Sequence, residues 1–147
     1  MPDPKLEIRA ATGHECAEVA LLLKTSGLPI HDIDVTLEGF LLAYEGARLV
    51  GTVGVESYGE VGLLRSLAVT EEYRNRGVGA RLVEAAVASA REQGIRTLYL
   101  LTTTAKGYFA RHGFRSVSRE EVPETIKRTG QFGGICPASA EVLYRDL

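Results

Sequence analysis

The sequence lacks the features that mark membrane-spanning, secreted and nucleic-acid-binding proteins. It has no run of about 18 apolar residues, which a membrane-spanning helix needs. The amino-terminal stretch MPDPKLEIRA has no apolar run for a signal peptide. The 17 basic and 19 acidic residues give a net charge of −2 without long blocks of one sign, whereas nucleic-acid-binding chains usually carry a basic stripe. We therefore expect a cytoplasmic protein with no nucleic-acid or membrane partner.

Side chains that bind metals are also scarce. The two cysteines, Cys16 and Cys136, lie far apart in the sequence, and the three histidines form no pair with metal-ligand spacing. Cys16 falls on the apolar face of a predicted helix, and free cysteine is among the residues most often buried. The sequence therefore predicts no metal site and a core position for Cys16.

What the sequence does contain is a regular alternation of strand-like and helix-like segments. Its 147 residues suit one domain, residues 1–147, with a single core. Alternating or continuous apolar residues predict strands over 6–10, 39–45, 48–58, 61–69, 97–102, 114–117 and 138–147. Helical spacing predicts a first helix after a Thr12–Glu15 capping box, and later helices over 77–93, about 104–112 and 120–129. This order is typical of an α/β or α+β fold built from layers.

The segment 67–79, LAVTEEYRNRGVG, carries the clearest functional signal. It leaves a predicted strand at Val69 and enters a predicted helix through Gly77 and Gly79. The amino terminus of a helix has unpaired N–H donors and a partial positive charge, and glycine lets the backbone approach a bulky phosphate. A loop that only needs glycine in order to turn is the alternative. Three nearby arginines favour the interpretation as an anion site. The spacing of the glycines differs from that in dinucleotide-binding and P-loop motifs.

Arg74-x-x-Gly77-x-Gly79 resembles the acetyl-CoA signature of the GNAT acetyltransferases, and Phe109-x-x-x-Gly113-Phe114 extends the resemblance. It implies the GNAT fold: a mixed, mostly antiparallel sheet of six or seven strands, helices on both faces, and a splay between strands four and five. It also implies acetyl-CoA as cofactor, with pantetheine paired to the strand backbone and an N–H near Leu67 polarising the thioester carbonyl. The implied cofactor-binding residues are Leu67, Ala68, Val69, Arg74, Asn75, Arg76, Gly77, Val78, Gly79, Ala80, Arg81 and Phe109.

Further segments narrow the resemblance within this family. The stretches LLRSLAV from Leu63, LYLLTTTA from Leu98 and ICPASA from Ile135 are similar to GNAT proteins of arsenic-resistance operons and to the acetyltransferase domain of N-acetylglutamate synthases. That implies a small acceptor of amino-acid type, such as glutamate or an analogue. Phe109 stands where many relatives have the tyrosine that protonates the departing thiolate, and Tyr108 lies about 100° further round the helix. Water or the substrate ammonium would then supply that proton.

Two charged residues are candidates on the acceptor side. Arg65 lies in an apolar strand, so its guanidinium needs a partner. That partner is either a neighbouring carboxylate, for which Glu56 is a candidate, or a substrate carboxylate, which suits the planar guanidinium. Glu56 is either a solvated residue near a turn or the base that takes the proton of the acceptor amine.

The remaining acceptor candidates are polar or lie in a glycine-containing segment. Threonines at the end of a strand either bind substrate or cap the next helix. Residues 125–135 are expected to form a lid over the acceptor, because the glycines in this segment would allow it to move. The predicted catalytic residues are Glu56 and Leu67, and the predicted acceptor-binding residues are Glu56, Arg65, Ser66, Thr102, Thr103, Thr104, Phe132 and Cys136.

Together these patterns predict an N-acetyltransferase in which a small-molecule amine attacks acetyl-CoA directly in a ternary complex, as a monomer or a homodimer. Two alternatives remain open. One is acetylation of a protein amine, which needs an open groove. The other is a non-catalytic acyl-CoA sensor, which the phenylalanine in the tyrosine position allows.

Overall fold

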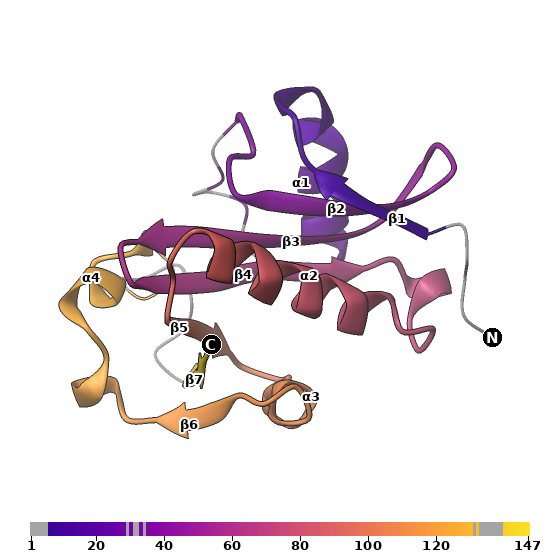
Figure 1. Ribbon diagram of the computed structural model, residues 1–147. Helices are drawn as coiled ribbons and strands as arrows, with labels where there is room; N and C mark the ends of the chain where they lie inside the picture. The colour runs from indigo at the N-terminus through magenta and orange to yellow at the C-terminus, as the bar shows by residue number, and fades with distance from the viewer. Residues whose placement is uncertain (1–5, 29, 31–32, 34, 131, 133–139) are drawn as a thin grey trace. The chain divides into compact units, whose positions relative to one another are not determined.

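The computed structural model describes residues 6–28, 30, 33, 35–130, 132 and 140–147. None of the helices in these ranges combines the length and the hydrophobicity that a membrane span requires. The order of strands and α-helices is β1 (Leu6–Ala10), α1 (Cys16–Thr25), β2 (Phe40–Glu45), β3 (Arg48–Tyr58), β4 (Val61–Val69), α2 (Val78–Glu92), β5 (Thr97–Thr102), α3 (Lys106–Ala110), β6 (Arg115–Val117), α4 (Glu124–Lys127) and β7 (Glu141–Asp146) (Figure 1). Short 3₁₀ turns are η1 (Gly13–Glu15), η2 (Glu71–Tyr73) and η3 (Arg119–Glu121).

Most predicted elements agree with the structure to within a few residues, and one is wrong. The capping box is present: Thr12 N donates to Glu15 Oε1 at 2.7 Å. The single helix predicted over 120–129 is instead η3 and α4, separated by Val122 and Pro123 in extended conformation (ψ 137° and 148°). Proline lacks an N–H and disfavours helix in the residue before it, so the chain cannot continue as one helix there.

The seven strands form one sheet in the order β1-β2-β3-β4-β5-β7-β6, which confirms the predicted α+β class. The pairs β1–β2, β2–β3, β5–β7 and β6–β7 are antiparallel, whereas β4 and β5 are parallel. The parallel register covers only Val61–Leu63 with Thr97–Tyr99, although both strands continue beyond it. Pairing between the fourth and fifth strands therefore covers three residues of each strand.

The chain divides into two compact units, Met1–Val55 with Ser66–Ala86, and Glu56–Arg65 with Val87–Leu147. In the first unit, α1 packs against one face of the strands, where Leu23 joins a core with Leu42 and Tyr44. The opposite face meets α2, because a Cβ on Gly51 would lie 2.8 Å from Leu82 Cδ1. Helices thus cover both faces of these strands, and glycine is needed where α2 comes closest.

The second unit has its own apolar core. Leu63 of β4, Ile126 of α4 and Val142 of β7 are buried together with Val122, and Tyr58, Tyr99 and Phe132 pack against them. Gly62 faces the other side of β4, where a Cβ would lie 2.9 Å from Ile95 Cδ1. The strands of the second unit are therefore also packed on both faces.

Two leucines of α1 provide a matched test of this packing. Leu23 is 0% exposed and Leu21 is 63% exposed. We expect Leu23→Ala to lower the free energy of unfolding by about 2–5 kcal/mol, because it leaves a cavity in the core. Leu21→Ala makes the same chemical change on the surface and is expected to cost no more than about 0.5 kcal/mol. Urea unfolding followed by circular dichroism measures both, and equal losses would contradict this account of the core.

Candidate active site

The connection between β4 and α2 has the geometry of an anion-binding loop. Asn75 and Gly77 both adopt left-handed backbone conformations, with φ of 66° and 84°. The first hydrogen bond of α2 runs from Arg81 N to the carbonyl of Gly77, at 3.1 Å. The N–H groups at positions 78–80 therefore precede the helical hydrogen-bonding pattern and are the donors available to a ligand. A Cβ on Gly77 would meet no atom within 4 Å, so the space beside it is open.

The three arginines predicted to surround this loop have different contacts. Arg74 Nε donates to the carbonyl of Val69 at 3.0 Å, which ties the loop to the end of β4. Arg81 Nη1 is 3.5 Å from the carbonyl of Leu6 on β1. The guanidinium of Arg76 lies 5.0 Å from the centre of the Tyr73 ring. All three belong to the first unit, and together they make the loop positively charged.

The backbone of β4 has a kink that the sequence did not predict. Ser66 has φ of 57°, in the left-handed region that non-glycine residues rarely adopt inside a strand. It lies between Arg65 and Leu67, where the resemblance implies an oxyanion-stabilising N–H. Such strain persists only where the surroundings impose it, and it is common at functional sites. No residue type in this stretch signals the kink, because serine has no special preference for that conformation.

Glu56 and Arg65, the two charged acceptor candidates, are paired in the second unit. Arg65 Nη1 donates to Glu56 Oε2 at 2.8 Å, and the Tyr58 hydroxyl donates to Glu56 Oε1. The Arg65 side chain is 1% exposed, whereas that of Glu56 is 29% exposed. The neighbouring-carboxylate interpretation of Arg65 is therefore the arrangement observed, and Glu56 is the member of the pair that reaches solvent.

The predicted threonines have unequal roles. Thr102 Oγ1 accepts a hydrogen bond from Ala105 N at 3.0 Å and so closes the turn between β5 and α3. It does not cap the helix itself, because the N-cap residue of α3 is Ala105, which has no side-chain cap. Thr103 and Thr104 follow it on the surface.

The aromatic side chains of α3 agree with the expected difference between Phe109 and Tyr108. Phe109 is buried and packs edge-on against Phe114, with ring centres 5.7 Å apart. The ring of Tyr108 lies 4.7 Å from that of His112, and burial raises the pKa of the Tyr108 hydroxyl. The Phe109 ring is thus part of the packed interior. The Tyr108 hydroxyl remains protonated at neutral pH, because its pKa is raised.

The segment predicted to act as a lid is anchored over part of its length. Ile126 is 0% exposed, and Thr129 is buried with its hydroxyl donating to the Ile126 carbonyl at 2.7 Å. Phe132 packs against the core of the second unit and lies 5.0 Å from the Arg119 guanidinium. Cys136 lies outside the described residues. The described part of this segment therefore contributes to the core.

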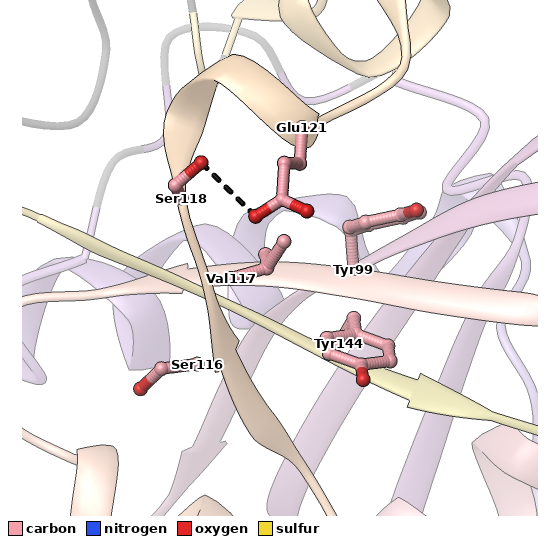
Figure 2. Close-up of a pocket in the computed structure, with 6 residues that line it drawn as sticks. All are labelled: Tyr99, Ser116, Val117, Ser118, Glu121 and Tyr144. Carbon is pink, nitrogen blue, oxygen red and sulfur yellow. Dashed lines mark hydrogen bonds between the residues drawn. The ribbon is translucent and has the colours of Figure 1, made fainter.

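A surface hollow of about 560 Å³ lies over β5, β6 and β7. Figure 2 shows its lining, with Ser118 Oγ donating to Glu121 Oε1 at 3.2 Å. Two tyrosines, with ring centres 6.4 Å apart, contribute the aromatic part of the surface. The lining residues are Tyr99, Ser116, Val117, Ser118, Glu121 and Tyr144, and none of them was predicted as a site residue.

Comparisons with known proteins find similarity to acetyltransferases. The family model for the acetyltransferase (GNAT) domain matches residues 36–116. An uncharacterized N-acetyltransferase of Chlorobaculum tepidum is 33% identical over 109 residues, which is 74% of this chain and 68% of the relative. An amino-acid acetyltransferase of Neisseria meningitidis is 28% identical over 151 aligned positions, covering 97% of this chain and 34% of the relative.

A solved structure is similar over nearly the whole chain. It is the N-acetylglutamate synthase of Neisseria gonorrhoeae in complex with coenzyme A and N-acetyl-glutamate, with a TM-score of 0.84 and 27% identity. The match covers 99% of this chain and 36% of the synthase. This chain thus spans about a third of the length of both Neisseria proteins.

Proposed function

We propose that this protein, which belongs to the GNAT acetyltransferase family, transfers the acetyl group of acetyl-CoA to the amine of a small metabolite of amino-acid type. The amine attacks the thioester directly in a ternary complex. The observation that carries the proposal is the loop before α2, with its left-handed Asn75 and Gly77 and its open space. The glutamate-like class of acceptor is supported by the similarity to amino-acid acetyltransferases.

The loop suits the diphosphate of coenzyme A in shape and in charge. Unpaired N–H groups at the start of α2 and the nearby guanidinium groups offer donors to phosphate oxygens. On β4, the backbone of Leu67, Ala68 and Val69 is assigned to the pantetheine arm, because an extended ligand can add to a strand. When bound, acetyl-CoA supplies the activated acetyl thioester. The N–H of Leu67, next to the kink at Ser66, is assigned as a donor to the thioester oxygen.

Glu56 is assigned the role of proton acceptor for the attacking amine. An amine is nucleophilic only after it loses its proton, and a carboxylate can take that proton directly or through a water molecule. Arg65 and Tyr58 each donate to one oxygen of Glu56, and each carboxylate oxygen can accept a further hydrogen bond. Arg65 is therefore a positioning residue that fixes the orientation of Glu56, in place of a clamp on the substrate.

A thiol-release assay tests the function itself. Purified protein is mixed with acetyl-CoA and a panel of amines that contains amino acids and a phosphinic amino acid, and products are identified by mass spectrometry. We expect free thiol and an acetylated amino acid of the glutamate type. Binding of coenzyme A without turnover on any amine would favour the non-catalytic sensor, and acetylation of peptides alone would favour a protein acetyltransferase.

Two glycines with similar positive φ provide a matched test of the cofactor loop. Gly77 and Gly27 have φ of 84° and 74°, and a Cβ at either position would meet no atom within 4 Å. Alanine at each should cost similar stability, about 1 kcal/mol, through backbone strain alone. We expect only Gly77→Ala to weaken coenzyme A binding in calorimetry, by about tenfold or more, because the strain falls where the diphosphate binds. Equal affinities for the two variants would contradict this assignment.

Glu56 can be compared with Glu60, an exposed residue in the following turn. We expect Glu56→Gln to lower kcat about 100-fold, the lower end of the usual contribution of a general base, with coenzyme A affinity retained. The decrease should be smaller at high pH, where more of the amine is already neutral. Glu60→Gln should leave kcat unchanged. A Glu56→Gln variant with the kcat and pH profile of the unaltered protein would remove Glu56 from the mechanism.

A further inference from the structure

Arg48, at the start of β3, is joined to the cofactor loop by two kinds of contact. Its guanidinium donates to both oxygens of Glu72, from Nη1 to Oε2 at 3.3 Å and from Nη2 to Oε1. The same guanidinium lies 5.3 Å from the centre of the Tyr73 ring. Both partners belong to η2, immediately before Arg74-x-x-Gly77. Arg48, next to the β2–β3 turn, therefore contacts the loop in two ways: by an ion pair with Glu72 and by a cation–π contact with the ring of Tyr73.

Tyr73 is shared between Arg48 and Arg76. Tyr73 is 7% exposed, and its hydroxyl donates to the carboxylate of Glu45 at the end of β2. The Arg76 guanidinium lies 5.0 Å from this ring. A guanidinium that rests on a fixed aromatic ring loses some of its freedom before a ligand arrives. The strand pair β2–β3 thus limits where Arg76 can be.

Glu72 is the residue that would compete with a ligand for Arg76. Its pKa is lowered, first by the hydrogen bond from Arg48, then by the charge of Arg48 and to a smaller extent by that of Arg76. In the part of the chain that the structure describes, Arg76 donates no hydrogen bond, whereas Arg74 and Arg81 donate to the carbonyls of Val69 and Leu6. Arg76 is the loop arginine whose donors are all available.

We propose that Arg48 is a positioning residue for cofactor binding, because it occupies Glu72 and supports Tyr73 and so leaves Arg76 ready for a phosphate group of coenzyme A. The inference rests on the proposed function and names a residue outside the family signature. The phosphate is either in the diphosphate or at the 3′ position, since both present the same chemistry to a guanidinium. A pair that served only the fold would contribute little, because Arg48 and Glu72 are 48% and 68% exposed.

Substitutions at the ion pair test this idea through rescue. Loss of Arg48 in Arg48→Gln releases Glu72 to pair with Arg76, and we expect the Kd for coenzyme A to rise about fivefold in calorimetry. Glu72→Gln alone should not weaken binding. The double variant Arg48→Gln/Glu72→Gln should recover most of the affinity, because no carboxylate then competes for Arg76. Both side chains are exposed, so all three proteins should fold, and thermal unfolding verifies it.

The Arg76→Gln variant tests whether Arg48 acts on cofactor binding through Arg76. We expect it to raise the Kd for coenzyme A about tenfold, and Arg48→Gln should then have no further effect, since coupled residues are not additive. The Kd of 3′-dephospho-coenzyme A, measured for Arg76→Gln and for the unaltered protein, distinguishes the two phosphates. If the substitution leaves this Kd unchanged, Arg76 contacts the 3′-phosphate. If it raises this Kd about as much as the Kd of coenzyme A, Arg76 contacts the diphosphate. Arg9→Gln is the control, because Arg9 also lies over a tyrosine ring, 4.2 Å from that of Tyr44, while its ion pairs are with Glu7 and Glu15.

Three results would overturn the proposal. They are an unchanged affinity in Arg48→Gln, a double variant as weak as Arg48→Gln, and an undiminished effect of Arg48→Gln in the Arg76→Gln background. A protein that binds no coenzyme A before any substitution would overturn the proposed function as well. Normal binding that is insensitive to Arg48→Gln would overturn only the role of Arg48.

Discussion

The connection from β4 to α2 depends on two left-handed residues separated by one position. With φ of 66° at Asn75 and 84° at Gly77, the chain turns sharply enough for α2 to begin at Val78. The first N–H groups of the helix then have no partner within the helix. A side chain on Gly77 would be strained in this conformation by about 1 kcal/mol, so glycine is the residue that adopts this turn most readily. The proposed cofactor site is a consequence of that turn.

A loop of this kind would be mobile if nothing held it, and here the neighbouring strands do. Glu45 and Arg48 contact Tyr73 and Glu72 from either side of the β2–β3 turn. On the other side, Arg74 is bound to the last carbonyl of β4. These contacts lie within the first unit, whose core comes from α1 and β2. The packing of the amino-terminal residues therefore contributes to the order of a loop that is distant in sequence.

The buried guanidinium of Arg65 imposes a second constraint. A charge that is 1% exposed must be paired, and Glu56 supplies the opposite charge at 2.8 Å. The same pairing orients a carboxylate that still reaches solvent. Structural and functional interpretations of Glu56 therefore do not exclude each other: the ion pair satisfies Arg65 and leaves the free lone pairs of Glu56 available. An apolar strand with a single arginine was enough to predict the need for a partner, and Glu56 was a correct candidate.

Elements with local signals could be predicted from the amino-acid sequence alone. Strands β1 and β3–β5 and helix α2 follow from apolar periodicity and from glycines at their ends. The loop before α2, which is the proposed cofactor site, follows from glycines and arginines at close spacing. Tertiary structure decided what depends on distant residues: the strand order with β7 between β5 and β6, the kink at Ser66, and the approach of Arg48 to Glu72. Local propensity does not encode these features, because each arises where packing between remote segments outweighs the intrinsic preference of the residues involved.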